Sequence, residues 1–552
     1  MNDFPCLGLE FLGKCSYDPS SPSRIYFSIG EGIAAIAILL VFTQLLRPII
    51  KFRLSVSKFG QQTAYILFFG AISCVFIAAI LPFIPGNALP LLGYPVFWEI
   101  MAGLLFLLVS VGFLWTFNNK AKFNKRNYKQ FVNNATILIA KGDDGDLKEL
   151  AVEILDSIPE ILDACKKYNR FNITEKNIVP EYTIYSLNLL DILSDEKFCQ
   201  ILVRHVPETV IPFFQKINEL KLYESGGYAF VKQLIHQAFS NKSSILHREE
   251  DFFGLGHLKS FTNTVFGNYE LINSFFRPLQ AWNYWKEDRL EPWQVKKYVQ
   301  SINVALEAYF SCSGWNFGFP SAIFSAYDVC AEITLTESLK LGNIKNDETY
   351  NNISLNNIME IGIGLEKSIE IINKFENLIP HYEVNLEDYD KFKDLSIYGV
   401  IANGLYGFYV KLSMAHSESI EIIARSLWIE IYPVSSGLET KAIKEIQKRL
   451  NYHLFKKVKE NLEKLHYPPL TRLLISIIGL YEPPNDTEER GAIIFIKEFI
   501  KLIRENFENI AKQAPQKAKD MIPESVRYDK KSGRLIQKTP YDKVYILDLR
   551  LK

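Results

Sequence analysis

Two histidines and three carboxylates lie close together near the middle of the chain, and their types and spacing could support metal chemistry. They are His247, Glu249, Glu250, Asp251 and His257. Imidazole and carboxylate groups can bind a divalent cation, and a carboxylate can act as a general base beside it. The spacing lacks the rigid patterns of strong zinc motifs. A solvated acidic turn is therefore the favoured interpretation, and a metal-dependent hydrolase or nuclease site is the alternative.

A second unusual stretch mixes aromatic rings with cations between residues 275 and 293. Its candidate binding residues are Trp282, Trp285, Arg289 and Trp293. Such residues often form a packed core covered by the stems of Arg and Lys. If they are exposed, we expect a protein partner, because Trp and Arg dominate interface hot spots. Nucleic acid is not indicated, since basic and acidic residues balance at 62 each.

The sequence contains no standard catalytic motif. A P-loop, an HExxH helix and a GxSxG turn are all missing. Gly362 and Gly364 have the wrong spacing for a phosphate loop and lie within a helical pattern. We therefore predict no cofactor and no resident metal, and a non-enzymatic role is favoured over an enzymatic one.

Composition excludes a wholly disordered chain. Of the 552 residues, 13% are aromatic and 48% hydrophobic, and the formal net charge is zero. Disordered chains are poor in aromatic residues and carry excess charge. The seven cysteines include no CxxC pair, so they make no disulfide framework. Cys6 and Cys15 could pair if they lie on the oxidising side of a membrane.

Hydrophobic residues concentrate in three long runs before residue 118. We expect transmembrane helices at about 29–50, 63–84 and 96–117, because each approaches the roughly 20 residues that cross the hydrocarbon. Glu31 and Glu99 lie near the ends of the first and third runs. Residues 1–26 would then be extracytoplasmic, and 27–117 would form the transmembrane domain.

Basic residues predict the orientation. Lys and Arg flank the link between the first two runs, whereas the link between the second and third has none. Cytoplasmic flanks carry the excess of Lys and Arg, so we expect the N-terminus outside and residues 118–552 in the cytoplasm of a bacterial inner membrane. The flank after the third run sets this topology and could also attract anionic lipid. Its residues are Lys120, Lys122, Lys125, Arg126 and Lys129.

Residues 118–552 follow a helical period for most of their length. We expect a large all-α region, either a helical bundle or an irregular α-solenoid, with a small β element at the C-terminal end. Polar segments at 240–256 and 342–353 are candidate boundaries within it.

The interpretation that follows is a membrane-anchored cytoplasmic sensor or interaction protein, such as a bacterial membrane-linked effector. Its helical region would bind a protein partner or a second copy, and its spans would anchor it among the membrane lipids or transmit a signal. Two alternatives stay open. One is an oligomeric channel or membrane-perturbing effector, and the other is a membrane-bound metal-dependent hydrolase or nuclease using the segment His247–His257.

Overall fold

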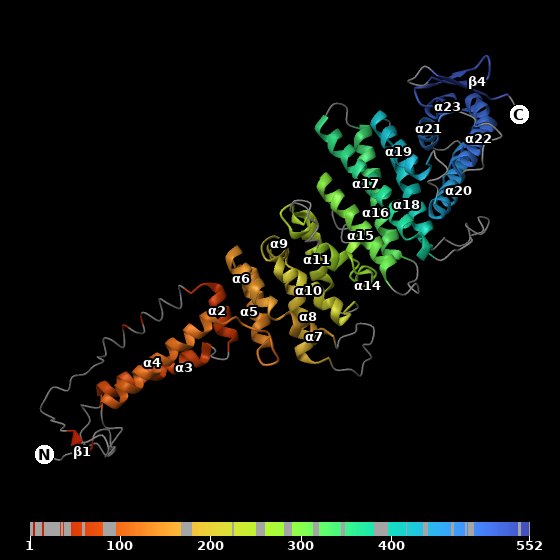
Figure 1. Ribbon diagram of the computed structural model, residues 1–552. Coiled ribbons are helices and arrows are strands. Elements are labelled where there is room, and N and C mark those ends of the chain that lie inside the picture. Colours follow the sequence, from red (N-terminus) through yellow and green to blue (C-terminus); the bar gives the residue numbers. More distant parts are fainter. Residues whose placement is uncertain are drawn as a thin grey trace. The chain divides into compact units, whose positions relative to one another are not determined.

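The computed structural model is mostly helical and divides into two compact units, residues 1–230 and 231–552 (Figure 1). It describes residues 46–57, 61–80, 95–166, 179–223, 226–249, 260–280, 290–312, 320–343, 348–379, 396–415, 417–433, 440–464, 469–480, 491–538 and 543–550, together with 4–5, 14–15, 34, 37 and 483. The division falls within one helix, α11 (Tyr228–Ser240), shortly before the predicted boundary at 240–256.

The first unit contains a short strand pair and a series of helices. Its elements are β1 (Phe4–Pro5), β2 (Lys14–Cys15), α2 (Pro48–Val56), α3 (Gln61–Ile80), α4 (Pro95–Asn118), α5 (Tyr128–Lys141), α6 (Asp144–Leu155), α7 (Ile158–Cys165), α8 (Glu181–Ile192), α9 (Glu196–His205) and α10 (Pro207–Leu220).

Helices α3 and α4 pack against each other as an antiparallel hairpin and are long and apolar enough to cross a membrane. Small residues bring them together, since Ala71 and Ala78 on α3 and Ala102 on α4 are almost fully buried. The outward faces carry large apolar side chains, with Ile66 71% and Leu114 63% exposed. The predicted spans at 63–84 and 96–117 correspond to these two helices.

The prediction of three spans is supported for only two helices among the described residues. Residues 29–45 lie outside them, apart from Ala34 and Ala37, which are helical. The predicted end of the first span at residue 50 is wrong. Pro48 starts α2 as a separate helix, because proline at the first helical position has no N–H to satisfy and a favourable φ. α2 packs against α4, α5 and α6.

The remaining helices of the first unit pack closely on one another, with α5 on α8, α7 on α8 and α10 on α6 and α7. The apolar residues of 147–162 recur at helical spacing on both sides of Pro159. The structure has two helices, α6 and α7, with Pro159 in the first turn of α7. The N-cap of α6 is Asp143, whose carboxylate accepts the N–H of Asp146 at 2.8 Å, so the helix begins at Asp144.

The second unit continues with helices and ends in a small sheet. Beyond α11, its elements are α12 (Ile245–Arg248), α13 (Ser260–Phe266), α14 (Tyr269–Ile272), α15 (Pro292–Ser311), α16 (Ser321–Asn343), α17 (Glu348–Lys374), the 3₁₀ turn η6 (Glu376–Leu378), α18 (Ile397–Leu412), α19 (Glu418–Ile431), α20 (Lys441–Glu463), α21 (Pro469–Ile478), α22 (Gly491–Gln513), α23 (Pro515–Asp520), β3 (Val526–Asp529), β4 (Arg534–Lys538) and β5 (Val544–Asp548).

Alternate helices of the second unit stack in two layers. One layer packs α15, α17, α19 and α21 in order, and the other packs α16, α18, α20 and α22. Figure 1 shows these helices side by side along the unit. In this arrangement each helix packs mainly on the next-but-one helix in sequence, as in an α-solenoid.

A buried polar network links three successive helices of these layers. The Tyr327 hydroxyl donates to Ser368 Oγ at 2.8 Å, and Ser368 Oγ donates to Asn303 Oδ1 at 2.7 Å. Asn303 Nδ2 in turn donates to the carbonyl of Gly364 at 3.2 Å. Because these buried groups satisfy one another, the network fixes the register of α15, α16 and α17.

Gly364 lies where α17 approaches α15 most closely, and we predict that Gly364→Ala destabilises the second unit. An added Cβ would lie 1.6 Å from Cγ1 of Val299, so the two helices must separate. Overpacking of this kind costs about 1–3 kcal/mol. The measurement is thermal unfolding of the full chain followed by circular dichroism. Gly362→Ala on the same helix is the control, since its Cβ would meet Ile423 at 3.5 Å. Equal melting temperatures for both variants would refute the prediction.

The C-terminal element is an antiparallel sheet in the order β3-β4-β5. Tyr528 lies opposite Leu535, and Leu535 lies opposite Leu547. Gly533 adopts φ 68° in the turn that joins β3 to β4, a conformation that favours glycine. The predicted small C-terminal β element is therefore confirmed, with Ser532 and Gly533 in the turn of its first hairpin.

Candidate functional site: an ion-pair junction at the base of the hairpin

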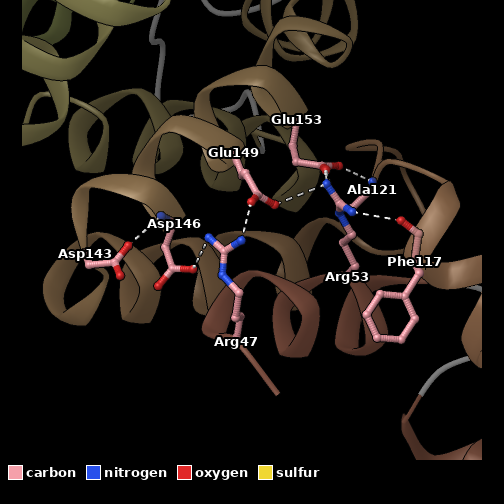
Figure 2. Close-up of polar contacts among 8 residues, drawn as sticks. All are labelled: Arg47, Arg53, Phe117, Ala121, Asp143, Asp146, Glu149 and Glu153. Atoms are coloured by element: carbon pink, nitrogen blue, oxygen red, sulfur yellow. Dashed lines mark hydrogen bonds and ion pairs between the residues drawn. The ribbon is translucent and has the colours of Figure 1, made fainter. Parts of the chain in front are cut away.

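Five charged residues join the base of the α3/α4 hairpin to α6. We call this set the junction, and its members are Arg47, Arg53, Asp146, Glu149 and Glu153. Figure 2 shows the two arginines reaching from α2 and the residue before it toward the three carboxylates on α6. On α6 the acids lie three and four residues apart and therefore share one face.

Arg53 is the central residue of the junction. Its Nε and Nη2 each lie 2.7 Å from Oε1 of Glu153, and its Nη2 lies 3.7 Å from Glu149. Its Nη1 donates to the carbonyl of Phe117 at 3.0 Å. That carbonyl belongs to the last turn of α4, where carbonyls have no partner within the helix and the dipole favours a cation. One guanidinium thus connects α2, α4 and α6.

Glu153 is the buried member of the junction, with 0% of its side chain exposed. Besides Arg53, its carboxylate accepts the backbone N–H of Ala121, in the segment that follows α4. Burial raises the pKa of the Glu153 carboxyl, whereas Arg53 and the Ala121 N–H lower it in part. The buried carboxylate therefore depends on Arg53 for its compensation.

Arg47 makes the outer contacts of the junction. Its Nη1 lies 2.7 Å from Glu149, and its Nη2 lies 3.5 Å from Asp146. Its side chain is 52% exposed, so water screens these pairs and each contributes at most about 1 kcal/mol.

Aromatic packing lies beneath the charges. Phe131 on α5 is fully buried and meets Phe52 of α2 edge to face at 5.1 Å. It also meets Phe123 at 5.4 Å, and Phe123 stacks on Tyr182 of α8 at 5.2 Å. The N–H of Phe123 donates to Ser157 Oγ at 3.0 Å. Together these contacts hold the segment after α4 against α2, α5 and α8.

The arrangement suits positioning rather than bond-making chemistry. The junction contains no Ser, Thr, Cys, Lys or His side chain, and its three carboxylates are paired with arginines. Across the parts of the chain that the structure describes, no group of three or more His, Cys, Asp or Glu residues could hold a metal ion. The junction joins the base of the apolar hairpin to α6 through short, charge-assisted hydrogen bonds.

Two residues of the candidate metal cluster are described, and each has a structural partner. His247 is buried, with Nε2 3.0 Å from the carbonyl of Phe239, and its ring meets Trp293 edge to face at 4.5 Å. Glu249 accepts the N–H of Phe261 at 2.5 Å and the hydroxyl of Thr262 at 2.6 Å. It therefore satisfies the N-terminal turn of α13. Glu250, Asp251 and His257 lie outside the described residues.

We predict that Glu249→Ala destabilises the second unit by about 1–2 kcal/mol, the usual cost of losing an N-terminal cap. Burial raises the pKa of the Glu249 carboxyl, while its bonds to Thr262 and Phe261 oppose this rise. Thermal unfolding of the full chain gives the stability, and elemental analysis of the purified protein gives the metal content. A capping role leaves the metal content unchanged, whereas loss of a bound metal together with unchanged stability would favour the metal-site hypothesis.

The other predicted site residues fall partly within the described chain. Trp293 lies at the start of α15 against His247, whereas Trp282, Trp285 and Arg289 lie outside the described residues. Cys6 also lies outside them. Cys15 is placed in β2 opposite Phe4, and its side chain is not described.

The basic flank after α4 divides into paired and unpaired residues. Lys120 pairs with Asp156 at 3.4 Å, and Lys129 pairs with Glu181 at 2.6 Å. Lys122, Lys125 and Arg126 are exposed and have no ion pair with any described residue. Sequence counting treated all five as one group, and only the fold separates them.

The sequence interpretation missed the junction, although a signal was present. Asp146, Glu149 and Glu153 repeat at helical spacing, and Arg47 and Arg53 lie six residues apart in the link between the first two apolar runs. The arginines were used only as evidence of orientation. Matching the acidic face to the basic link requires knowing that α2 packs on α6, a contact between segments about a hundred residues apart.

In comparisons with known proteins, no family model matches the chain, and no curated protein or solved structure is significantly similar to it.

Proposed function

We propose that this chain is a membrane-anchored interaction or sensor protein, in which the α3/α4 hairpin lies in lipid and the helical region binds a cytoplasmic protein partner. The observation that carries the proposal is the junction, in which Arg53 joins the end of α4 to α6. An anchor that only retained the protein at a membrane would not need such a connection.

The exposed faces of the hairpin support the membrane part of the proposal. Leu107, Val111 and Leu114 are more than half exposed on α4, and Ile66 and Phe69 on α3 are similarly exposed. Large contiguous apolar patches are rare on the surfaces of soluble monomers. Lipid tails would cover these faces without any further protein contact.

Basic residues support the proposed orientation. Arg47, Lys51 and Arg53 precede α3, and Lys122 and Lys125 follow α4, so all are close in sequence to the same end of the antiparallel hairpin. By the positive-inside rule that end faces the cytoplasm. The N-terminal segment would then lie outside, as the sequence predicts.

Fractionation and protease protection test the anchoring and the orientation. The full chain, with a tag at its C-terminal end, is expressed in bacteria, and membranes are washed with alkaline carbonate. We expect the protein in the pellet, and we expect the tag to be digested in inside-out vesicles but protected in intact spheroplasts. Recovery in the supernatant would overturn the anchoring, and digestion of the tag in spheroplasts would overturn the orientation.

Photocrosslinking of two matched chains tests whether the helical region binds a partner. It also tests whether the junction couples the hairpin to that binding. A crosslinking amino acid is placed at exposed positions of the helical region in the wild-type chain and in the Arg53→Ala chain. With the wild-type chain we expect one discrete crosslinked partner protein. With the Arg53→Ala chain we expect a weaker adduct, or an adduct formed from different positions. Absence of any discrete adduct across the scanned surface would contradict partner binding, and identical adducts in both chains would contradict transmission through the junction.

A further inference from the structure

We infer that the segment between α4 and α5 is a binding site for the headgroup of an anionic phospholipid, formed by Lys122, Lys125 and Arg126. This inference rests on the membrane anchoring proposed above and identifies the lipid class that the base of the hairpin prefers. Three features of the segment support this inference: its backbone is ordered, its positive charge is unbalanced, and it continues directly from the apolar hairpin.

The segment is held in one conformation by its own side chains. The carbonyl of Lys122 accepts Nδ2 of Asn124 at 3.1 Å and Nδ2 of Asn127 at 2.8 Å. Asn124 Oδ1 accepts the N–H of Arg126 at 2.9 Å, and Asn127 Oδ1 accepts the N–H of Asn124 at 2.9 Å. The two asparagines therefore fix the backbone that carries all three cations.

Alternate residues of the segment are anchored inward. Ala121 and Phe123 are buried, with their N–H groups bonded to Glu153 and Ser157. Lys122, between them, is exposed. Because the backbone is already ordered, binding a headgroup would not carry the additional entropic cost of ordering this loop.

The charge of the segment is not balanced from within the described chain. The cations on either side have carboxylate partners, Asp156 for Lys120 and Glu181 for Lys129. Lys122, Lys125 and Arg126 have none among the described residues. A phosphodiester supplies one negative charge with several acceptor oxygens that the three cations can share, and Arg and Lys suit phosphate oxygens both as charges and as hydrogen-bond donors.

The position of the segment favours a lipid over a soluble anion. It follows directly on α4, whose last turns expose Leu114 and Trp115. Tryptophan is enriched at the level of the headgroups, where its ring is amphipathic. A headgroup bound at Lys122 would extend its acyl chains along the exposed face of α4, which a free phosphate ion cannot do.

The test is native mass spectrometry of the full chain in detergent, with phosphatidylglycerol or phosphatidylcholine added at equal concentration. We expect the wild-type protein to bind phosphatidylglycerol more tightly. The affinity should fall about fivefold for each cation removed, and so about a hundredfold in K122S/K125S/R126S. The charge-preserving variant K122R/K125R/R126K should retain the preference. K530S/K531S/K538S removes the same charge from the C-terminal sheet and should bind as the wild type does.

Three outcomes would overturn the inference. They are equal binding of the two lipids by the wild-type chain, an unchanged preference in K122S/K125S/R126S, and an equal loss in the control at Lys530, Lys531 and Lys538. Displacement of the lipid by millimolar inorganic phosphate would likewise assign the site to a soluble anion. A protein that fractionates with membranes but shows no lipid preference would refute this inference alone. A protein that remains in the supernatant would refute the anchoring itself.

Discussion

Replacing Arg53 with alanine is expected to destabilise the junction by about 3–5 kcal/mol, the cost of leaving a buried charge without its partner. Glu153 is fully buried and pairs with Arg53 through two nitrogens at 2.7 Å. The substitution also removes the donor to the carbonyl of Phe117 at the end of α4. Hydrogen exchange of the full chain in detergent measures the effect, and amides of α6 should exchange about a hundredfold faster or more.

Arg47→Ala is the matched control. Arg47 pairs with Glu149 on the same face of α6, but its side chain is 52% exposed. Its loss should cost less than about 1 kcal/mol. The double variant Arg53→Met/Glu153→Met removes both buried charges and should recover much of the stability, since apolar residues can replace a buried ion pair. Equal effects of Arg47→Ala and Arg53→Ala would contradict the central role of Arg53.

The destabilisation by Arg53→Ala should depend on pH. Burial raises the pKa of Glu153 above its ordinary value of 4.5, and Arg53 opposes that rise. Because the pKa of this carboxyl is higher in the folded than in the unfolded chain, its contribution to stability is fully present below the unfolded pKa. That contribution is lost as the pH rises through the folded pKa. Without Arg53 the folded pKa rises further. The difference in the free energy of unfolding between Arg53→Ala and the wild-type chain should therefore shrink as the pH is lowered from about 8 to about 5.

Phe131→Ala is expected to be nearly as disruptive, with a loss of about 3–5 kcal/mol. Phe131 is fully buried and contacts the rings of Phe52 and Phe123, which belong to α2 and to the segment after α4. Its removal leaves a cavity beneath the junction and loses both edge-to-face contacts.

Hydrogen exchange also measures the Phe131 variant, with faster exchange expected in α2, α5 and residues 119–127. Phe131→Leu keeps most of the side-chain volume and should destabilise the chain less than Phe131→Ala. This comparison distinguishes the effect of a cavity from the effect of any substitution in α5. Exchange that is unchanged in residues 119–127 of Phe131→Ala would show that the ring does not support that segment.

Much of the secondary structure could be predicted because it depends on local chemistry. The apolar runs at 63–84 and 96–117 set the length of α3 and α4, and the Ser532-Gly533 turn set the hairpin of the terminal sheet. Pro159 marked the break between α6 and α7. The predicted end of the first span at residue 50 was wrong for an equally local reason. The apolar residues around it suggested a continuous helix, whereas Pro48 favours the start of a new one.

The candidate site could not be predicted because it depends on contacts distant in sequence. The positive charge of Arg47 and Arg53 indicates orientation equally well whether or not an acidic helix lies beside them. Nothing in the linear pattern distinguishes Glu153, which is buried and paired, from the many exposed glutamates of the chain. Likewise, Lys122 and Lys120 look equivalent until Asp156 is seen beside one of them.

Arg53 on α2 bonds both α4 and α6, and this connection limits how the hairpin can rotate relative to α6. A flexible linker would let the hairpin rotate about its long axis without affecting the rest of the unit. Here the planar guanidinium bonds both the final turn of α4 and the final turn of α6. A twist imposed on the hairpin by its surroundings would therefore turn α6 as well, and with it α9 and α10, which pack on α6.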